Sequence, residues 1–265
     1  MTSLHRPIAV FDAGIGSYAI VTEIRKRLPR QDILYFADRA SFPYGAMGRE
    51  RMLATMRATI DFLSGYDPCA IVIASNAPSI MVFDALKPFS PVPIFDVFPP
   101  LAEALEASQS GSVGIMGVRS LIESEMLPPF IARHTDNPQR VATFNASSMV
   151  ALVEDGSFLF DPVTTQEAVN AFTGDIFARY PDIDVLTLSS THLPWLRPFF
   201  EKARPNCMFL DPAEAIVAGI GDGKPGNGYI LGLATESPDY DLATFQHMLA
   251  LIGVDIPLES VAPLA

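Results

Sequence analysis

Two short segments of the sequence carry polar side chains in the same order and could act together on one small ligand. Residues 71–79 read IVIASNAPS, and residues 185–194 read VLTLSSTHLP. Each is an apolar, β-rich run that ends in a small hydroxyl residue, then a side chain able to bond a carboxylate, and soon a proline. The matched strand ends, at Ser75 and Ser190, predict two related half-sites that face one small polar ligand.

The side chains around these serines suggest acid–base chemistry or carboxylate binding. A serine hydroxyl is a weak acid and needs an adjacent base to act. His192 is a candidate acid–base or orienting group; the alternative is a packed or capping histidine. Asn76 and Thr191 can either bond a carboxylate or satisfy local turns. Asp12, which follows the apolar run at residues 8–11, can accept from an ammonium group or cap the next helix.

The elements that position these side chains alternate between short apolar runs and helical periodicity, which is typical of a parallel α/β sheet. Strands are predicted at residues 8–11, 31–37, 70–74, 112–116, 141–144, 185–188 and 229–233. Residues 91–95 lead to a further strand or a crossover, and the apolar run 207–210 precedes a helix. Helices are predicted at 18–28, 48–64, 78–86, 164–180 and 242–251. Two more are predicted with open ends, one from the turn at 117–120 through residue 130 or beyond, and one from residue 211 onward. The glycine-rich stretch 219–228 is predicted to be a flexible connector.

Composition narrows the class of protein. The chain has 265 residues, 49% of them hydrophobic, which is enough for one large or two modest domains. A net charge of −12 argues against nucleic acid or an anionic membrane as partner. No apolar stretch approaches the roughly 20 residues that span a bilayer, and residues 1–7 lack a signal-peptide core, so a cytoplasmic protein is expected. Cys69 and Cys207 form neither a disulfide framework nor a metal-ligand spacing, so no metal is expected.

Four motifs in order along the chain resemble one known family. They are FDAGIG at residues 11–16, Pro-Tyr-Gly at 43–45, Ser-Asn-Ala at 75–77 and Ser-Thr-His at 190–192. This set is similar to the cofactor-independent aspartate/glutamate racemase family, and most similar to its glutamate racemase branch. The resemblance implies two similar α/β domains with mainly parallel sheets and the ligand cleft between them. The first domain would comprise residues 1–97 plus 212–265, and the second 98–211.

The same resemblance implies an activity. Members interconvert L- and D-glutamate by two-base transfer of the α-proton without a cofactor, which supplies D-glutamate for peptidoglycan. The expected partners are an acidic amino acid and a second copy of the chain, with no nucleic acid or membrane. The implied catalytic residues are Ser75, Ser190, Asp12 and His192, and the implied substrate contacts are Ala13, Pro43, Tyr44, Gly45, Asn76, Ala77, Thr191 and Glu154. Residues 43–45 could instead form only a turn, and Glu154 could be a solvated carboxylate at a helix end.

The chain departs from the family where the chemistry is expected. Members use two cysteines, one in each domain, and the aligned positions here are Ser75 and Ser190. Ala13 and Ala77 also stand where the family usually has serine and threonine. The chain is therefore either a deliberate double Cys→Ser variant or a natural relative with changed or lost chemistry. In both cases we expect glutamate racemisation to be impaired or absent.

Two other functions remain open. The FDAGIGS segment also resembles the first phosphate loop of sugar kinases and actin-like ATPases, in which backbone N–H groups bind phosphate. No second phosphate loop or adenosine motif accompanies it. The missing cysteines also fit a non-catalytic relative that binds an acidic amino acid or another protein without turnover.

Overall fold

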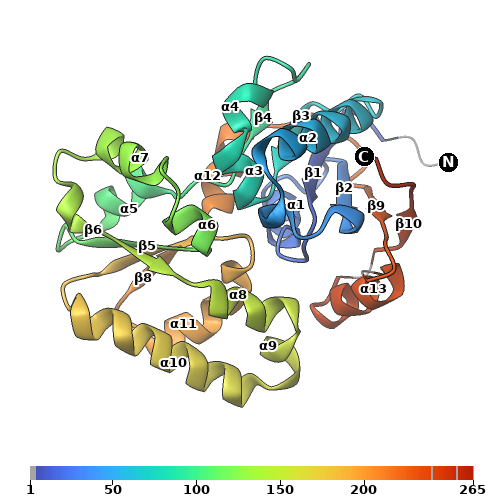
Figure 1. Ribbon diagram of the computed structural model, residues 1–265. Coiled ribbons are helices and arrows are strands. Elements are labelled where there is room, and N and C mark those ends of the chain that lie inside the picture. Colours follow the sequence, from blue (N-terminus) through green and yellow to red (C-terminus); the bar gives the residue numbers. More distant parts are fainter. Residues whose placement is uncertain (1–3, 240, 255, 265) are drawn as a thin grey trace. The chain divides into compact units, whose positions relative to one another are not determined.

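The computed structural model describes residues 4–239, 241–254 and 256–264, and its contacts divide the chain into two compact units (Figure 1). The first unit comprises Met1–Val97 and Ile216–Ala265, and the second comprises Phe98–Ala215. Each unit contains one parallel β-sheet with helices, so the predicted α/β class with two parallel sheets is confirmed. The division falls within helix α12 (Pro212–Ile220), four residues beyond the boundary that the sequence suggested.

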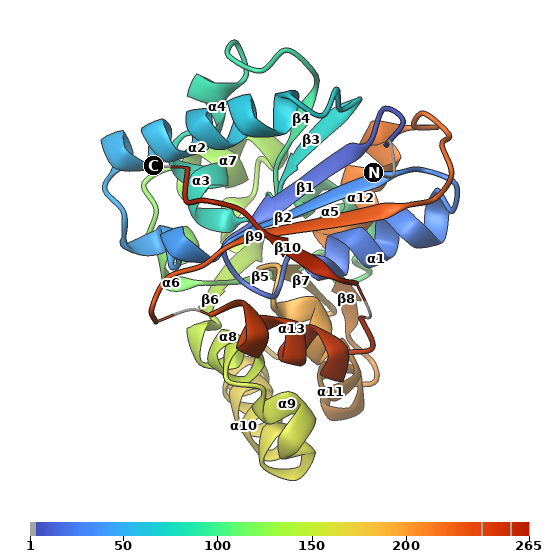
Figure 2. The ribbon, with the colours of Figure 1, turned by 90° about the vertical axis from the view of Figure 1, so that its right-hand side faces the viewer.

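The first unit contains a six-stranded sheet in the order β10-β9-β2-β1-β3-β4, with every ladder parallel (Figure 2). The strands are β1 (Ile8–Asp12), β2 (Ile33–Asp38), β3 (Ala70–Ile73), β4 (Ile94–Phe95), β9 (Ile230–Thr235) and β10 (Leu258–Ser260). The accompanying helices are α1 (Tyr18–Arg27), α2 (Arg49–Ser64), α3 (Asn76–Met81), α4 (Phe83–Leu86) and α13 (Leu242–Leu251), with short 3₁₀ turns η1 (Arg39–Ser41) and η2 (Tyr44–Ala46).

The three central strands of this sheet are buried along their whole length, which explains why they read as continuous apolar runs. Side chains alternate between the two faces of a strand. The face that includes Phe11 packs against apolar residues of α2. On the other face, Tyr35 of β2 meets Tyr18 of α1 edge-on, with ring centroids 5.3 Å apart. A helix therefore covers each face of the sheet, as right-handed crossovers in opposite directions require.

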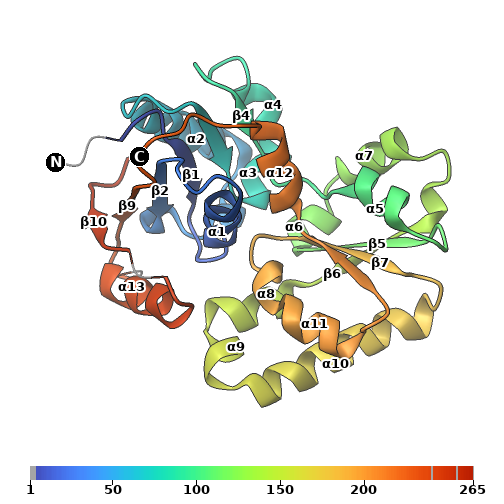
Figure 3. The ribbon, with the colours of Figure 1, turned by 180° about the vertical axis from the view of Figure 1, so that it is seen from behind.

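The second unit contains a four-stranded sheet in the order β6-β5-β7-β8, again fully parallel. Figure 3 shows α5 and α7 on one face of this sheet, and α10 and α11 on the other. The strands are β5 (Val113–Gly117), β6 (Val141–Asn145), β7 (Val185–Ser189) and β8 (Met208–Leu210). The helices are α5 (Leu101–Ala107), α6 (Arg119–Ile122), α7 (Leu127–His134), α8 (Ser147–Glu154), α9 (Ser157–Phe160), α10 (Pro162–Arg179) and α11 (Arg197–Ala203), with 3₁₀ turns η3 (Pro138–Arg140) and η4 (Leu193–Leu196).

Two predicted helices are interrupted. The helix expected at 78–86 begins at Asn76 and breaks at Val82, whose φ and ψ of −137° and −3° lie outside the helical region. The helix expected to run to residue 130 ends at Ile122, and a new one begins at Leu127 with prolines in its first turn. Proline is tolerated there because the first N–H groups of a helix have no partner within it.

The glycine-rich stretch 219–228, predicted to be a flexible connector, leads from α12 to β9 and makes specific hydrogen bonds. Its first residues belong to α12, and the remainder is hydrogen-bonded to the segment before β2. Gly226 N donates to Arg30 O at 2.8 Å, and Asn227 N donates to Asp32 Oδ1 at 2.9 Å. A Cβ on Gly226 would lie 2.7 Å from the Asp32 carboxylate, so glycine permits this close approach. Among the described residues, no helix is long and apolar enough to cross a membrane.

Candidate active site

The two serines occupy equivalent positions in the two sheets. The order β2-β1-β3-β4 within the first sheet matches β6-β5-β7-β8 in the second. The first residue of β3, Ala70, pairs with the start of β1, and the first residue of β7, Val185, pairs with the start of β5. Each serine lies five residues beyond, at positions 75 and 190, just past the carboxyl end of its strand. In open parallel sheets this edge is where ligands bind.

Ser190 lies beside an imidazole. Its Oγ is 3.5 Å from Nδ1 of His192 and accepts a long hydrogen bond, 3.4 Å, from the His192 backbone N–H. On the other side of the ring, His192 Nε2 contacts Glu154 Oε1 at the C-terminal end of α8. The structure thus brings three of the predicted residues together as a Ser–His–Glu array within the second unit. Glu154, predicted as either a site residue or a solvated helix-end carboxylate, is the partner of the histidine.

The Glu154 contact assigns the proton on the ring. A carboxylate can only accept, so Nε2 carries the hydrogen that it donates to Glu154. In the neutral imidazole Nδ1 is then the basic nitrogen, and it faces the Ser190 hydroxyl and, at 3.4 Å, Thr191 Oγ1. The arrangement presents a base to a serine, which is what a hydroxyl requires to transfer a proton.

Ser75 lies in a different environment. It is the N-cap residue of α3, with extended φ and ψ of −144° and 131°, and its side chain makes no capping hydrogen bond. Its carbonyl accepts from Ser79 Oγ at 2.7 Å. The neighbouring Asn76, predicted to bind a carboxylate, is buried and donates from Nδ2 to Val97 O at 3.1 Å. Ala77 is buried in the apolar core below. Among the described residues, no basic side chain bonds the Ser75 hydroxyl.

Asp12 ends β1, the strand next to β3, and is 4% exposed. Burial raises the pKa of Tyr44 well above its ordinary value, and the negative charges of Asp38 and Asp12 add to this effect. Burial, with a smaller contribution from Asp12, also raises the pKa of Tyr35. Both phenols therefore remain protonated near neutral pH, and each keeps a hydrogen that it can donate.

A carboxylate that the sequence interpretation missed holds the Pro43–Gly45 segment. Asp38, 1% exposed at the end of β2, accepts from Tyr44 OH at 3.0 Å and from Thr235 Oγ1 at 2.8 Å. Thr235 Oγ1 in turn accepts from Ala40 N at 2.9 Å. The turn at 43–45 is thereby fastened to the end of β9. The available signal was that Asp38 ends its apolar strand just as Asp12 ends the first.

A buried arginine supports the same region. Arg39 donates from Nη1 to Ala13 O at 2.6 Å, and its guanidinium lies 4.8 Å from the Phe42 ring and 4.6 Å from the Phe245 ring. These contacts connect the loop after β1, the loop after β2 and α13. A Cβ added to Gly45 would meet no atom within 4 Å, so the space beside this glycine would admit a side chain.

The two cysteines lie at the opposite ends of the strands from the serines. Cys69 immediately precedes β3, so roughly 20 Å of extended chain separates it from Ser75. Cys207 immediately precedes β8, whose first residue pairs with the start of β7. Burial, followed by the charge of Asp184, raises the pKa of the Cys207 thiol to about 12. Neither thiol is placed to replace a serine. Among the described residues, no cluster of three His, Cys, Asp or Glu side chains could hold a metal ion.

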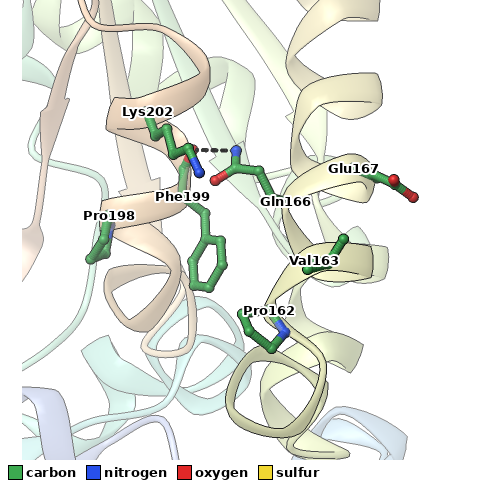
Figure 4. A pocket seen from close by; sticks show the side chains of 7 residues that line it. All are labelled: Pro162, Val163, Gln166, Glu167, Pro198, Phe199 and Lys202. Carbon is green, nitrogen blue, oxygen red and sulfur yellow. Dashed lines mark hydrogen bonds between the residues drawn. The ribbon is translucent and has the colours of Figure 1, made fainter.

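A groove of about 410 Å³ lies between α10 and α11 in the second unit (Figure 4). Its lining includes Val163, Phe199 and Lys202, and Gln166 Nε2 bridges the two helices by donating to Phe199 O at 3.1 Å. None of the residues predicted from the sequence lines it. The groove is therefore distinct from the Ser–His–Glu array.

Comparisons with known proteins relate the sequence and the fold of this chain to one family. No protein-family model matches the chain. The glutamate racemase of Syntrophus aciditrophicus is 33% identical over 212 residues, which cover 79% of this chain and 77% of that protein. The crystal structure of Thermus thermophilus glutamate racemase with beta-chloro-D-alanine has a TM-score of 0.78 at 28% identity, covering 97% and 96% of the two chains. The Francisella tularensis enzyme in complex with D-glutamate shares the fold, with a TM-score of 0.76 at 24% identity and 97% coverage of each chain.

Proposed function

The chain belongs to the glutamate racemase family of isomerases, and we propose that it binds glutamate and acts, slowly, at the α-carbon. The reaction interconverts L- and D-glutamate without a cofactor. Its product D-glutamate is used in peptidoglycan synthesis. Ser75 and Ser190 replace the paired thiols of the family, so racemisation by the unmodified chain is severely impaired. As in the family, the working form is a homodimer.

One observation carries this proposal. Ser75 follows β3 and Ser190 follows β7, which hold the same place in the matching strand orders β2-β1-β3-β4 and β6-β5-β7-β8. Both serines also lie at the same register, as expected of two groups with equivalent roles in one reaction. Each is followed by a residue with a donor group, Asn76 in the first unit and Thr191 in the second. A ligand with a carboxylate suits this pair of donors.

The roles follow from the chemistry of an amino acid. Its carboxylate needs donors, which Asn76, Thr191 and adjacent backbone N–H groups supply. Its ammonium group needs an acceptor, and the buried carboxylate of Asp12 is suited to it. Proton transfer at the α-carbon needs a group on each face, and hydroxyls are much weaker acids than thiols, whose ordinary pKa is about 8.5.

Two measurements test the proposal. Isothermal calorimetry should detect binding of glutamate to the unmodified chain and no binding of ATP. Circular dichroism of D-glutamate should show negligible conversion by the unmodified chain and sustained conversion by the double variant Ser75→Cys, Ser190→Cys. The gain in the double variant should far exceed the product of the two single-variant gains, because racemisation needs both groups.

The alternatives give different results. Tight ATP binding without glutamate binding would replace the proposal with a nucleotide-binding function. Glutamate binding by a double-cysteine variant that remains inert would favour a non-catalytic binding protein. Rapid racemisation by the unmodified chain would show that serine is not the limiting residue.

A further inference from the structure

The two serines differ in what surrounds them, although their positions in the sheets are equivalent. Ser190 has an imidazole nitrogen at 3.5 Å, and a carboxylate fixes that imidazole from its other side. The Ser75 hydroxyl makes no capping bond, and no base is bonded to it among the described residues. The neighbouring strand β1 ends in a carboxylate, Asp12. A carboxylate, with a reference pKa of about 3.9, is a weaker base than an imidazole, at about 6.5.

From this asymmetry we infer a one-faced activity: the unmodified chain exchanges the α-hydrogen of one glutamate enantiomer with solvent and retains its configuration. The inference rests on the proposed function, since it requires glutamate to bind with its α-carbon next to Ser190. It differs from racemisation because the proton leaves and returns on the same face. The substrate is the enantiomer that presents its α-hydrogen to the Ser190 hydroxyl.

The proton transfers balance without a co-reactant. The α-C–H bond breaks, its electron pair remains on the α-carbon and is delocalised into the adjoining carboxylate, and the proton passes to Ser190 Oγ. The hydroxyl proton of Ser190 moves to Nδ1 of His192, and Glu154 stabilises the resulting imidazolium. In D₂O the proton that Ser190 Oγ took from the α-carbon is then replaced by a deuteron, through exchange of the Ser190 hydroxyl and the imidazole with solvent. The reverse transfer then forms a C–D bond on the original face.

The geometry permits the exchange with solvent that this sequence of transfers needs. The side chains of His192 and Glu154 are 12% and 20% exposed, so water reaches the array, whereas Ser190 is 1% exposed. The reacting hydroxyl is thus shielded, and its base is in contact with solvent. Thr191 Oγ1, 3.4 Å from Nδ1, is a second hydroxyl close to the same base.

The experiment follows loss of the α-proton signal by NMR in D₂O, with separate samples of D- and L-glutamate and high enzyme concentration. Circular dichroism of the same samples reports configuration. We expect one enantiomer to incorporate deuterium with unchanged configuration, and the other to exchange at least about 10-fold more slowly. His192→Asn should lower the exchange rate about 100-fold, the usual lower range for loss of a general base.

The variants separate chemistry from structure. His134→Asn is the matched control, because His134 also lies in the second unit, where its Nδ1 bonds Phe130 O at 2.8 Å and its ring packs on the Phe130 ring. It should leave the exchange rate unchanged. Glu154→Gln keeps an acceptor for His192 but removes the charge, so it should slow exchange about 10-fold without changing the Kd for glutamate. Thermal unfolding checks that each variant folds.

Each outcome decides the question. Exchange confined to one enantiomer and lost in His192→Asn supports the inference. Equal exchange of both enantiomers, or deuterium incorporation with inversion, overturns it. Glutamate binding without any exchange overturns the inference and leaves glutamate binding as the surviving part of the proposed function, which the Ser75→Cys, Ser190→Cys variant still tests. Absence of glutamate binding defeats both.

Discussion

The buried carboxylate of Asp38 allows a quantitative test of how the Pro43–Gly45 segment is held. Its two oxygens accept from separate donors, Tyr44 OH on Oδ2 and Thr235 Oγ1 on Oδ1. Tyr44→Phe and Thr235→Val each remove one donor and leave the shape of the side chain nearly unchanged. Since the carboxylate is 1% exposed, water cannot easily replace either donor.

The magnitudes follow from these contacts. A hydrogen bond to a charged group contributes about 1.5–3 kcal/mol, so Tyr44→Phe should lower the free energy of unfolding by about 2 kcal/mol. Thr235→Val should cost about 3 kcal/mol, because it also removes the acceptor of the Ala40 N–H. The double variant should cost about 1 kcal/mol more than the sum, since it leaves the buried charge without either donor.

Urea unfolding followed by far-UV circular dichroism measures these changes, and calorimetry with glutamate measures their effect on the site. Thr22→Val, which removes a hydroxyl bonded to Tyr18 O within α1, is the control for threonine and should cost under about 1 kcal/mol. A double variant whose cost equals the sum of the singles, or a Tyr44→Phe cost below about 0.5 kcal/mol, would refute the role assigned to Asp38. We also expect weaker glutamate binding in the double variant.

Three further predictions concern stability and reactivity. Burial raises the pKa of Asp32, but hydrogen bonds from backbone N–H groups lower it more, so the folded-state pKa lies below the ordinary value. The stability that Asp32 contributes is therefore present above about pH 4 and is lost as the pH falls further. In Asp32→Asn, the midpoint of urea unfolding should depend less steeply on pH in that acidic range. Gly114→Ala should cost about 1–3 kcal/mol in urea unfolding, because its Cβ would lie 2.5 Å from Leu186 Cδ2. The Cys207 thiol should react with a disulfide reagent at about pH 8 only after unfolding.

The elements of this chain were largely predictable because their patterns are local. Buried parallel strands read as continuous apolar runs, and each predicted strand has a counterpart in the structure. The segment 91–95, left open between a strand and a crossover, contains the short strand β4. The sequence interpretation missed β10 (Leu258–Ser260), a three-residue edge strand, and the short helices α5, α9 and α11. It placed Glu154 at a possible helix end but gave no bounds for α8. Elements of three to eight residues show too few periods for a pattern to stand out, and tertiary contacts decide them.

The candidate site was predictable where its residues follow strands directly, and not where partners come from distant parts of the chain. Ser75, Ser190 and His192 stand in recognisable segments. The pairing of His192 with Glu154, 38 residues earlier, depends on where α8 ends in space. The bond between Asp38 and Thr235, 197 residues apart, depends on β9 lying beside β2, which no local pattern encodes.

The position of β9 beside β2 also bears on how the molecule is made on the ribosome. The second unit is one continuous stretch, Phe98–Ala215, and all of its sheet emerges in a single run. The first unit begins earlier, but β2 can pair with β9 only after β9 has been synthesised. The interval between the synthesis of β2 and that of β9 is on the order of 10 s at ordinary rates of translation. During that interval the nascent N-terminal segment presents an apolar strand with an open edge, which is the kind of surface that chaperones bind. The unit translated first is thus the one completed last.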